Sequence, residues 1–282
     1  MDGLEIRMNE SERNDISSFI EGEFGIKMPP VKKVMLTSRL AKRLKILGLE
    51  SYSEYYRYIR SSEGMKGELF IFTDLVSTHE TGFFREPQHF DYLVSSVLPE
   101  LASTRESGTR HPLKVLSAAC STGEEAYTIA IMAEEYRNSL ASSYLYRITG
   151  TDISTRVVQD AARGVYREAR VQNVPLHLRR KYFMEGKEAK AGLVRIVPEL
   201  RACTVFFPMN LMDYTYPFAE KFDIIFCRNA LIYFDRTNQE KILQRLTGCL
   251  KKNGYLFIGH SETMTGYNLP VRCVEPTVYR RN

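Results

Sequence analysis

Arg228 and Asn229 directly follow Phe222–Cys227, an apolar segment typical of a buried strand. In an open α/β sheet, ligands bind in the crevice outside the carboxyl ends of the strands. A guanidinium and a carboxamide at such a strand end are therefore candidates to face a bound small molecule. Taken alone, this segment is equally consistent with a buried strand that ends in a polar cap.

A second candidate site is the turn Ser117–Glu125, which follows the expected strand Leu113–Leu116. Its residues are small, so its backbone can approach a ligand closely before the next helix begins. The turn holds one glycine and lacks the GxGxxG pattern of dinucleotide-binding folds. The acids Glu124 and Glu125 would oppose a pyrophosphate at this helix start, whereas they suit a cationic group such as an ammonium or a sulfonium. Acids that merely favour the helix dipole are the alternative.

Asp152 ends the next expected strand, Tyr144–Thr151. An acid at this place in a nucleotide-binding βαβ unit grips ribose hydroxyls. Together with the acidic turn after the first strand, Asp152 favours an adenosyl cofactor that carries no pyrophosphate.

The elements that position these residues alternate between strands and helices from Leu113 onward, which predicts an α/β fold with a mostly parallel, doubly wound sheet. Two apolar stretches, Leu193–Val197 and Cys203–Val205, leave no room for a helix between them and indicate a small antiparallel β-subdomain near residues 180–207. Strands are expected at Leu113–Leu116, Tyr144–Thr151, Val205–Phe207, Phe222–Cys227, Tyr255–Ile258 and Thr277–Tyr279.

The N-terminal region has helical periodicity without an intervening strand pattern, which predicts a four-helix domain over residues 1–77. Pro29-Pro30 separates its first two helices. Residues 78–86 are expected to form a linker that contributes to the cofactor site, and residues 87–282 to form the cofactor-binding domain. Pro87 suits the first position of a helix that ends near Leu101.

Composition narrows the class of protein. The 282 residues are 44% apolar, none of the apolar runs approaches the length of a membrane helix, and the N-terminus lacks the form of a signal peptide, so we expect a cytoplasmic protein. Five dispersed cysteines without a CxxC pair favour reduced packing thiols. The spacing of histidines and cysteines shows no metal-ligand pattern, so no metal is expected.

The formal net charge of +5 is unevenly distributed. No acid lies between Glu23 and Glu50, whereas this stretch holds Lys27, Lys32, Lys33, Arg39, Lys42, Arg43 and Lys45. Such a basic stripe suits an acidic protein surface or a nucleic acid, and it is also what an ordinary solvated helix face looks like.

Several blocks, in order along nearly the whole chain, resemble the CheR-type chemoreceptor methyltransferases, which use S-adenosylmethionine. The combination is far more specific than any single block. The blocks are Thr78–Pro87, Ser117–Glu125, Asp152, Arg179–Met184, Asn210-Leu211, Phe226–Asn229 and Gly259–Glu262.

The resemblance implies a role for each matching residue. Asp152 would bind the ribose hydroxyls, Asn210 and the backbone of Leu211 would border the adenine, and Glu125 with Arg228 and Asn229 would surround the methionine end. Thr81, Arg85 and the residue at position 79 would close the pocket from the interdomain segment.

The chain departs from the family pattern at two of these places. His79 stands where the family usually has Asn, and Ala126 where it usually has Pro. A histidine reproduces one hydrogen bond of an asparagine but not both in the same geometry. We therefore hypothesise that cofactor affinity is pH-sensitive, which parallel pH profiles of the parent and of His79→Asn would refute.

In this family the methyl group goes to a glutamate side chain of a chemoreceptor and forms a γ-methyl ester. A glutamate with an unperturbed pKa of about 4.3 is already ionised at neutral pH and needs no general base. Arg85 is the candidate to steer that carboxylate, with Tyr233 supporting it. A structural salt bridge for Arg85 and a core position for Tyr233 are the alternatives.

The resemblance also gives the basic stripe a partner, because receptor methylation sites lie in glutamate-rich helical bundles. Arg39, Lys42, Arg43 and Lys45 would dock there electrostatically. Some family members also bind the receptor's C-terminal peptide as an added strand on the small antiparallel subdomain, and the loop Glu185–Gly192 leaves this open here.

Two other functions remain as alternatives. A nucleic-acid or small-molecule methyltransferase would share the fold, but the segment after Cys227 is not of the Asn-Pro-Pro-aromatic type and no aromatic-basic ladder for bases is evident, so nucleic acid is not expected as a partner. The second alternative is a non-catalytic signalling adaptor that binds the cofactor or the receptor. The one feature that favours it is His79 in place of the family's usual Asn.

Overall fold

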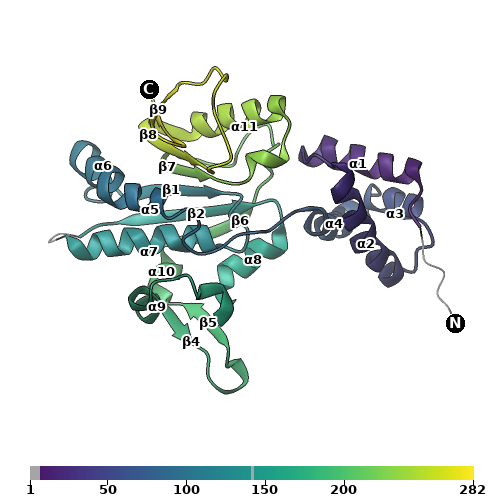
Figure 1. Ribbon diagram of the computed structural model, residues 1–282, viewed down its shortest axis with the longest axis horizontal. Coiled ribbons are helices and arrows are strands. Elements are labelled where there is room, and N and C mark those ends of the chain that lie inside the picture. The colour runs from purple at the N-terminus through teal and green to yellow at the C-terminus, as the bar shows by residue number, and fades with distance from the viewer. Residues whose placement is uncertain (1–6, 141–142) are drawn as a thin grey trace. The chain divides into compact units, whose positions relative to one another are not determined.

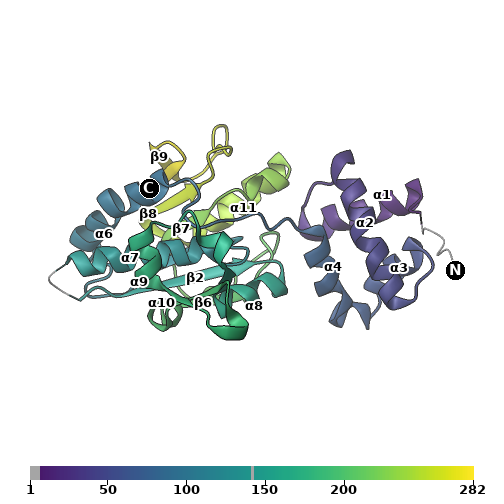
Figure 2. The same ribbon diagram turned by 60° about the horizontal axis from the view of Figure 1, so that its bottom comes forward.

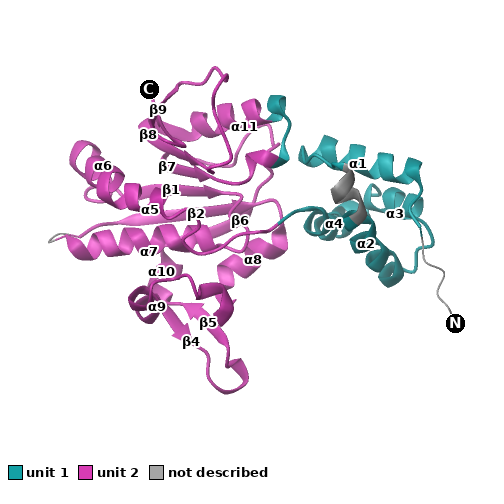
Figure 3. Ribbon diagram, in the orientation of Figure 1, with its two compact units in different colours: residues 1–78, 233–238 teal, residues 79–232, 239–282 magenta. Residues whose placement is uncertain are grey.

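The computed structural model describes residues 7–140 and 143–282, apart from the side chains of residues 30–34. The chain divides into two compact units, one of residues 1–78 and 233–238 and the other of residues 79–232 and 239–282 (Figure 3). Within the described part of the chain, no helix has both the length and the apolar character needed to cross a membrane.

The first unit is helical, as the sequence predicts. Glycines at positive φ end its first two helices, Gly25 at 67° and Gly48 at 68°. Leu36, Leu40 and Leu44 recur at helical spacing and are buried. The helices are α1 (Glu10–Phe24), α2 (Pro30–Leu47), α3 (Tyr52–Ile59) and α4 (Glu68–Val76), with the short 3-10 helix η1 (Gly64–Lys66) before α4.

Two arginines of α2 are used inside this unit. Arg43 donates to both carboxylate oxygens of the buried Glu68, at 2.7 and 2.6 Å, and Tyr55 adds a hydrogen bond of 2.9 Å to the same carboxylate. Arg39 donates to the carbonyls of Leu75 and Ser77 at the end of α4, at 2.8 and 3.2 Å. Both arginines therefore stabilise the contacts between α2 and its neighbours.

The second unit contains a seven-stranded sheet with the order β6-β2-β1-β7-β8-β10-β9 (Figure 1). Five strands from β6 to β8 pair in parallel, whereas β10 pairs antiparallel with β8 and with β9. The mostly parallel α/β sheet predicted from the sequence is confirmed. The strands are β1 (Leu113–Ala118), β2 (Tyr146–Asp152), β6 (Thr204–Pro208), β7 (Phe222–Cys227), β8 (Leu250–Ile258), β9 (Val271–Glu275) and β10 (Val278–Arg281).

Helices cover the faces of this sheet (Figure 2). The helix α7 packs against β1, β2 and β6, and α8 packs against β2 and β6. The expected helix after Pro87 is a longer run that ends at Arg105 and includes five residues of π-helix. These helices are α5 (Gln88–Tyr92), η2 (Leu93–Val97), α6 (Leu98–Arg105), α7 (Glu124–Ser139), α8 (Thr155–Arg163) and α11 (Arg236–Cys249), with the 3-10 turn η5 (Leu231–Tyr233) before α11.

A small antiparallel sheet of order β3-β5-β4 branches from the second unit, but its extent differs from the expected residues 180–207. It starts earlier, at β3, and the segment Thr204–Pro208 pairs in parallel with β2 instead. Pro198 begins a short helix that carries the chain from one sheet to the other. The elements are β3 (Val165–Arg167), η3 (Glu168–Val171), α9 (Leu176–Tyr182), β4 (Phe183–Glu185), η4 (Glu188–Lys190), β5 (Leu193–Ile196) and α10 (Pro198–Ala202).

The register of the large sheet brings the chemical residues together. Ala118 at the end of β1 pairs with Thr151, and Ser117 pairs with Phe226 of β7. The carboxyl ends of β2, β1 and β7 therefore lie side by side. The residues that follow them face the same edge of the sheet, which is where an open α/β fold binds its ligand.

Candidate active site

The turn between β1 and α7 has an unusual backbone. Ala119 and Ser121 have positive φ values of 59° and 50°, and Gly123 has a φ of 93°. A Cβ atom on Gly123 would lie 2.8 Å from the Cβ of Ala161, so this position requires glycine both for its conformation and for its packing. The turn is therefore tight and closely packed against α8.

Asp152 is buried at the end of β2, where the turn holds its carboxylate. The backbone N–H of Ser121 donates to Oδ2 at 2.9 Å, and the N–H of Ser154 donates to Oδ1 at 3.1 Å. Burial raises the pKa of Asp152, and these backbone donors oppose the rise. The backbone N–H of Ile153 also bonds this carboxylate, and with about four lone-pair sites the group remains able to accept a hydrogen bond from a ligand.

Glu125 lies in the first turn of α7 and has two partners. Ser117 donates to its Oε1 at 2.7 Å, and Nη1 of Arg228 donates to Oε2 at 3.2 Å. Burial raises the pKa of Glu125 while the charge of Arg228 lowers it. Glu124, the other acid at this helix start, is fully buried and accepts hydrogen bonds from Arg170 at 3.1 Å and Thr122 at 2.6 Å.

Arg228 joins three segments of the second unit. Besides its bond to Glu125, its Nη2 donates to the carboxylate of Glu86 at 2.8 Å and to the carbonyl of Arg85 at 2.5 Å. Its guanidinium lies 5.4 Å from the ring centre of Phe90. Only 1% of the side chain is exposed, so two carboxylates balance a cation that is almost entirely removed from water.

Asn229 is held in a left-handed backbone conformation, with a φ of 57°. Its backbone N–H donates to Glu262 at 3.0 Å, and its Nδ2 donates to Glu86 at 3.1 Å. Glu262 also accepts from the N–H groups of Leu231 at 2.8 Å and Gly259 at 2.6 Å. Glu262 therefore fixes the loop after β7 through its backbone.

Glu86 is a residue of the cluster that the sequence did not indicate. Burial raises the pKa of its carboxyl, but hydrogen bonds from Arg228 and Asn229 outweigh that effect and lower the pKa to about 2. Its φ is 56°, an uncommon value for a residue other than glycine. No strand end marks this acid in the sequence, and its partners lie far along the chain.

The other residues of the interdomain segment are placed differently. The carbonyl of His79 accepts a hydrogen bond of 3.1 Å from Ser121, and the charge of the His79 imidazole opposes the rise in the pKa of Asp152. Thr81 is half-buried. Arg85 is exposed, and its guanidinium donates to the carbonyl of Glu80 at 3.1 Å. The Arg85 side chain is therefore oriented outward, whereas its carbonyl binds Arg228.

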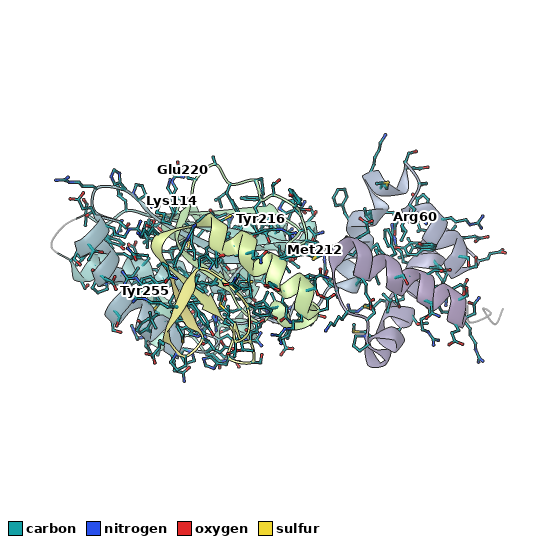
Figure 4. The ribbon with its side chains drawn as sticks, turned by 90° about the horizontal axis from the view of Figure 1, so that it is seen from above. Arg60, Lys114, Met212, Tyr216, Glu220 and Tyr255 are labelled. Carbon is teal, nitrogen blue, oxygen red and sulfur yellow. The ribbon has the colours of Figure 1, made fainter. Side chains whose placement is uncertain are left out.

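Asn210 and Leu211 follow β6, next to the end of β2. The N–H of Met209 donates to the carbonyl of Asp152 at 2.9 Å, which places this loop beside the acid. The carboxamide oxygen of Asn210 accepts from the N–H of Met212 at 2.9 Å. The carbonyl of Leu211 accepts a hydrogen bond of 2.9 Å from the hydroxyl of Tyr216. Met212 and Tyr216 are labelled in Figure 4.

Comparison with known families accounts for both units. The description "CheR methyltransferase, SAM binding domain" matches residues 79–280, and "CheR methyltransferase, all-alpha domain" matches residues 11–76. The chain belongs to the CheR methyltransferase family. It is an S-adenosylmethionine-dependent methyltransferase, and S-adenosylmethionine is its cofactor.

Relatives of this CheR methyltransferase match over nearly their full length. The chemotaxis protein methyltransferase of Borreliella burgdorferi is 37% identical, with 99% of this chain and 97% of the relative covered. Chemotaxis protein methyltransferase 2 of Pseudomonas aeruginosa is 37% identical over 90% of this chain and 87% of its own. The chemotaxis protein methyltransferase of Escherichia coli is 35% identical over 92% and 87%.

Two groups of residues expected in this CheR methyltransferase lie in the first unit. Tyr233 is half-buried, and its carbonyl accepts a hydrogen bond of 2.8 Å from the N–H of Lys27. Of the basic residues of α2, Arg39 and Arg43 are used in internal hydrogen bonds, whereas Lys42 and Lys45 are exposed. The side chains of Lys32 and Lys33 lie outside the described residues.

Proposed function

We propose that this protein transfers the methyl group of S-adenosylmethionine to glutamate side chains of chemoreceptors and forms γ-methyl esters in chemotaxis adaptation. The observation that carries the proposal is the match of the whole chain to both domains of one family, whose relatives are named chemotaxis protein methyltransferases. The cluster of polar residues at the ends of β1, β2 and β7 supports it.

The chemistry of this cluster fits the cofactor. Asp152 would bind the ribose hydroxyls with the lone pairs that its backbone donors leave available. Glu125, whose side chain is 13% exposed at the start of α7, would face the cationic methionine end together with Arg228 and Asn229. Asn210 and the backbone of Leu211 would border the adenine, and His79, Thr81 and Arg85 would close the site from the segment 79–86.

Arg85 is the residue we assign to the substrate carboxylate. Arg228 is fully buried and already balanced by Glu86 and Glu125, so it offers little net attraction to a further anion. Arg85 is exposed, and its guanidinium donates to the neutral carbonyl of Glu80. A guanidinium in this state is available for bidentate contact with a carboxylate.

The reaction makes modest demands on the protein. When bound, S-adenosylmethionine supplies a methyl group on a positively charged sulfur. The substrate glutamate is ionised at neutral pH, because its ordinary pKa is about 4.3, so the chain need not remove a proton. What remains for these residues is to align the two reactants, which lowers a barrier by roughly 7–11 kcal/mol in favourable cases.

Docking on the receptor would use the exposed face of α2. Arg39 and Arg43 contribute to the fold of the first unit, so Lys42 and Lys45 are the residues of the proposed docking surface with charges directed to solvent. They would meet the glutamate-rich helices that surround the methylation sites. A second contact, a receptor C-terminal peptide added as a strand to β4, is supported by the position of β4 at the edge of the small sheet.

Mass spectrometry tests the substrate. The protein is incubated with S-adenosylmethionine and the cytoplasmic helical fragment of a chemoreceptor, and the modified peptides are sequenced. We expect the mass of one methyl group on glutamate side chains of the receptor helices. Modification at lysine, or a shift of RNA or DNA in a binding assay together with an unmodified receptor, would instead support a different methyltransferase class.

A further inference from the structure

A compact cluster in the second unit consists of Glu86, His89 and His260. The proposed methyl transfer gives no role to its two histidines. Oε2 of Glu86 lies 3.5 Å from Nδ1 of His89 and 3.9 Å from Nε2 of His260. One ligand atom from each residue lies within 4.8 Å of the other two, and the two imidazole centres are 4.9 Å apart. The three residues come from the interdomain segment, from α5 and from the end of β8.

The hydrogen bonds of Thr277 determine which nitrogen of His89 carries the proton. The Thr277 hydroxyl lies 2.6 Å from the carbonyl of Pro276, and a carbonyl can only accept, so the hydroxyl proton points there. The same hydroxyl oxygen lies 2.7 Å from Nε2 of His89 and must accept a hydrogen bond from it. In a neutral imidazole this leaves Nδ1 with a lone pair and no proton.

This assignment leaves two acceptors facing each other. Nδ1 of His89 has no hydrogen-bond partner among the described residues, and the side chain is 97% buried, with 3% of it exposed. Oε2 of Glu86, which lies 3.5 Å from this nitrogen, also carries lone pairs. A cation between the two groups would turn this repulsive arrangement into an attractive one.

We propose that Glu86, His89 and His260 bind a divalent transition metal ion such as Zn²⁺. Two imidazole nitrogens and one carboxylate are a ligand set that Zn²⁺ uses in proteins, with water in the fourth position, whereas Mg²⁺ and Ca²⁺ prefer oxygen ligands. The hydrogen bond from His89 to Thr277 is the outer contact that orients a metal-binding imidazole.

The cluster can close around an ion at little cost. Bonds of about 2.0–2.2 Å to each ligand require the three ligand atoms to move together by roughly 1 Å. The side chain of His260 is 49% exposed, so it is able to make this movement without disturbing the core. The positive charge of Arg228 opposes the binding of a metal ion, because Arg228 binds the same carboxylate of Glu86 at 2.8 Å. Glu125, the second carboxylate paired with Arg228, offsets part of that charge.

The experiment uses the full-length protein after treatment with a chelator that is then removed. Titration with Co²⁺ reports coordination through its visible absorption, and Zn²⁺ affinity follows from competition with a chromogenic chelator. We expect about one ion per chain, a four-coordinate Co²⁺ spectrum without a thiolate charge-transfer band, and displacement by Zn²⁺. This readout does not depend on methyl transfer.

Variants decide whether these three residues are the ligands. His260→Ala should weaken Zn²⁺ binding by at least about 10-fold, whereas His177→Ala, an exposed histidine on α9, should leave it unchanged. His89→Gln is the second variant, and its circular dichroism is compared with the parent's to check its fold. Absence of binding in the parent, a thiolate band, or equal losses in His260→Ala and His177→Ala would overturn the proposal.

Discussion

The guanidinium of Arg228 lies 2.8 Å from the carboxylate of Glu86, and the two groups belong to segments far apart in the chain. The pair connects the loop after β7 to the interdomain segment, and Asn229 donates to the same carboxylate. A buried cation is stable only while its partners remain. The geometry of the proposed cofactor site therefore depends on a residue outside the strand ends.

Replacing Glu86 with Gln should destabilise the second unit by about 1–3 kcal/mol, because Arg228 would remain buried with one fewer carboxylate. Urea denaturation of the parent and the variant measures this change. Glu80→Gln is the matched control, since Glu80 is exposed and should change stability little. Equal stability of the parent and Glu86→Gln would show that the pair is dispensable.

Asp152→Asn should weaken S-adenosylmethionine binding by about 10- to 100-fold, because a neutral carboxamide keeps one acceptor but loses the charge and the second acceptor. Calorimetric titration with the cofactor measures the loss. Asp160→Asn on α8 is the control, because the Asp160 side chain is 37% exposed and pairs with Arg163. Unchanged affinity in Asp152→Asn would remove the ribose assignment.

Gly259 is predicted to tolerate no side chain. A Cβ at this position would lie 2.5 Å from Nδ2 and 2.8 Å from the backbone N of Asn229, so Gly259→Ala should cost about 1–3 kcal/mol and shift the loop after β7. Gly248 in α11 has no atom within 4 Å of such a Cβ, and Gly248→Ala should stabilise the protein by up to about 1 kcal/mol. In thermal unfolding, we expect the midpoint temperature to fall in Gly259→Ala and to rise in Gly248→Ala.

The stability of the protein should fall as the pH drops from about 7 to 4. Burial, and then the charge of Arg228, lower the pKa of His89 from 6.5 to about 4, so in this window the unfolded chain binds a proton that the folded one does not. The free energy of unfolding therefore decreases with falling pH, by at most about 3 kcal/mol from this residue.

Urea unfolding at several pH values, in the presence of a chelator, tests this dependence. His89→Gln should flatten the slope between pH 7 and 4 by about one proton, whereas His111→Gln, an exposed histidine, should leave it unchanged. A slope that is the same in the parent and in His89→Gln would contradict the assignment.

Reversing the charges of Lys42 and Lys45 should slow receptor methylation and reduce its dependence on salt, if the proposed docking surface is correct. Reversing Lys241 and Lys252, two exposed lysines in the second unit, changes the net charge by the same amount and serves as the control. Methylation rates at low and high ionic strength give the measurement. Equal rates in the double variant and in the control would place docking elsewhere.

The strand ends were predictable because the pattern is local. Phe222–Cys227 is apolar except for Asp223 and is followed by Arg228 and Asn229, and the sequence alone gives the bounds of β7. The strands β3 and β9 have no such run, since β3 has a single buried side chain between two exposed ones and β9 has none. The sequence pattern places Cys203–Val205 in the small sheet because the helix Pro198–Ala202 is too short to show a periodicity, and no helix is predicted there.

The site was predictable only where a residue follows a strand. Arg228, Asn229 and Asp152 have such positions, whereas the roles of Glu86 and His89 depend on contacts with residues far along the chain. Arg43 is a further example. In the sequence its charge is typical of a docking surface, whereas in the structure it forms an ion pair with Glu68 inside the first unit.

Transfer of labelled methyl from S-adenosylmethionine to chemoreceptor-containing membranes, followed by mild alkali, tests the central claim most directly. A carboxyl methyl ester is hydrolysed by base, so the account predicts labelled receptor that releases its label as methanol. Bound cofactor with an unlabelled receptor, or label that alkali does not release, would contradict the account.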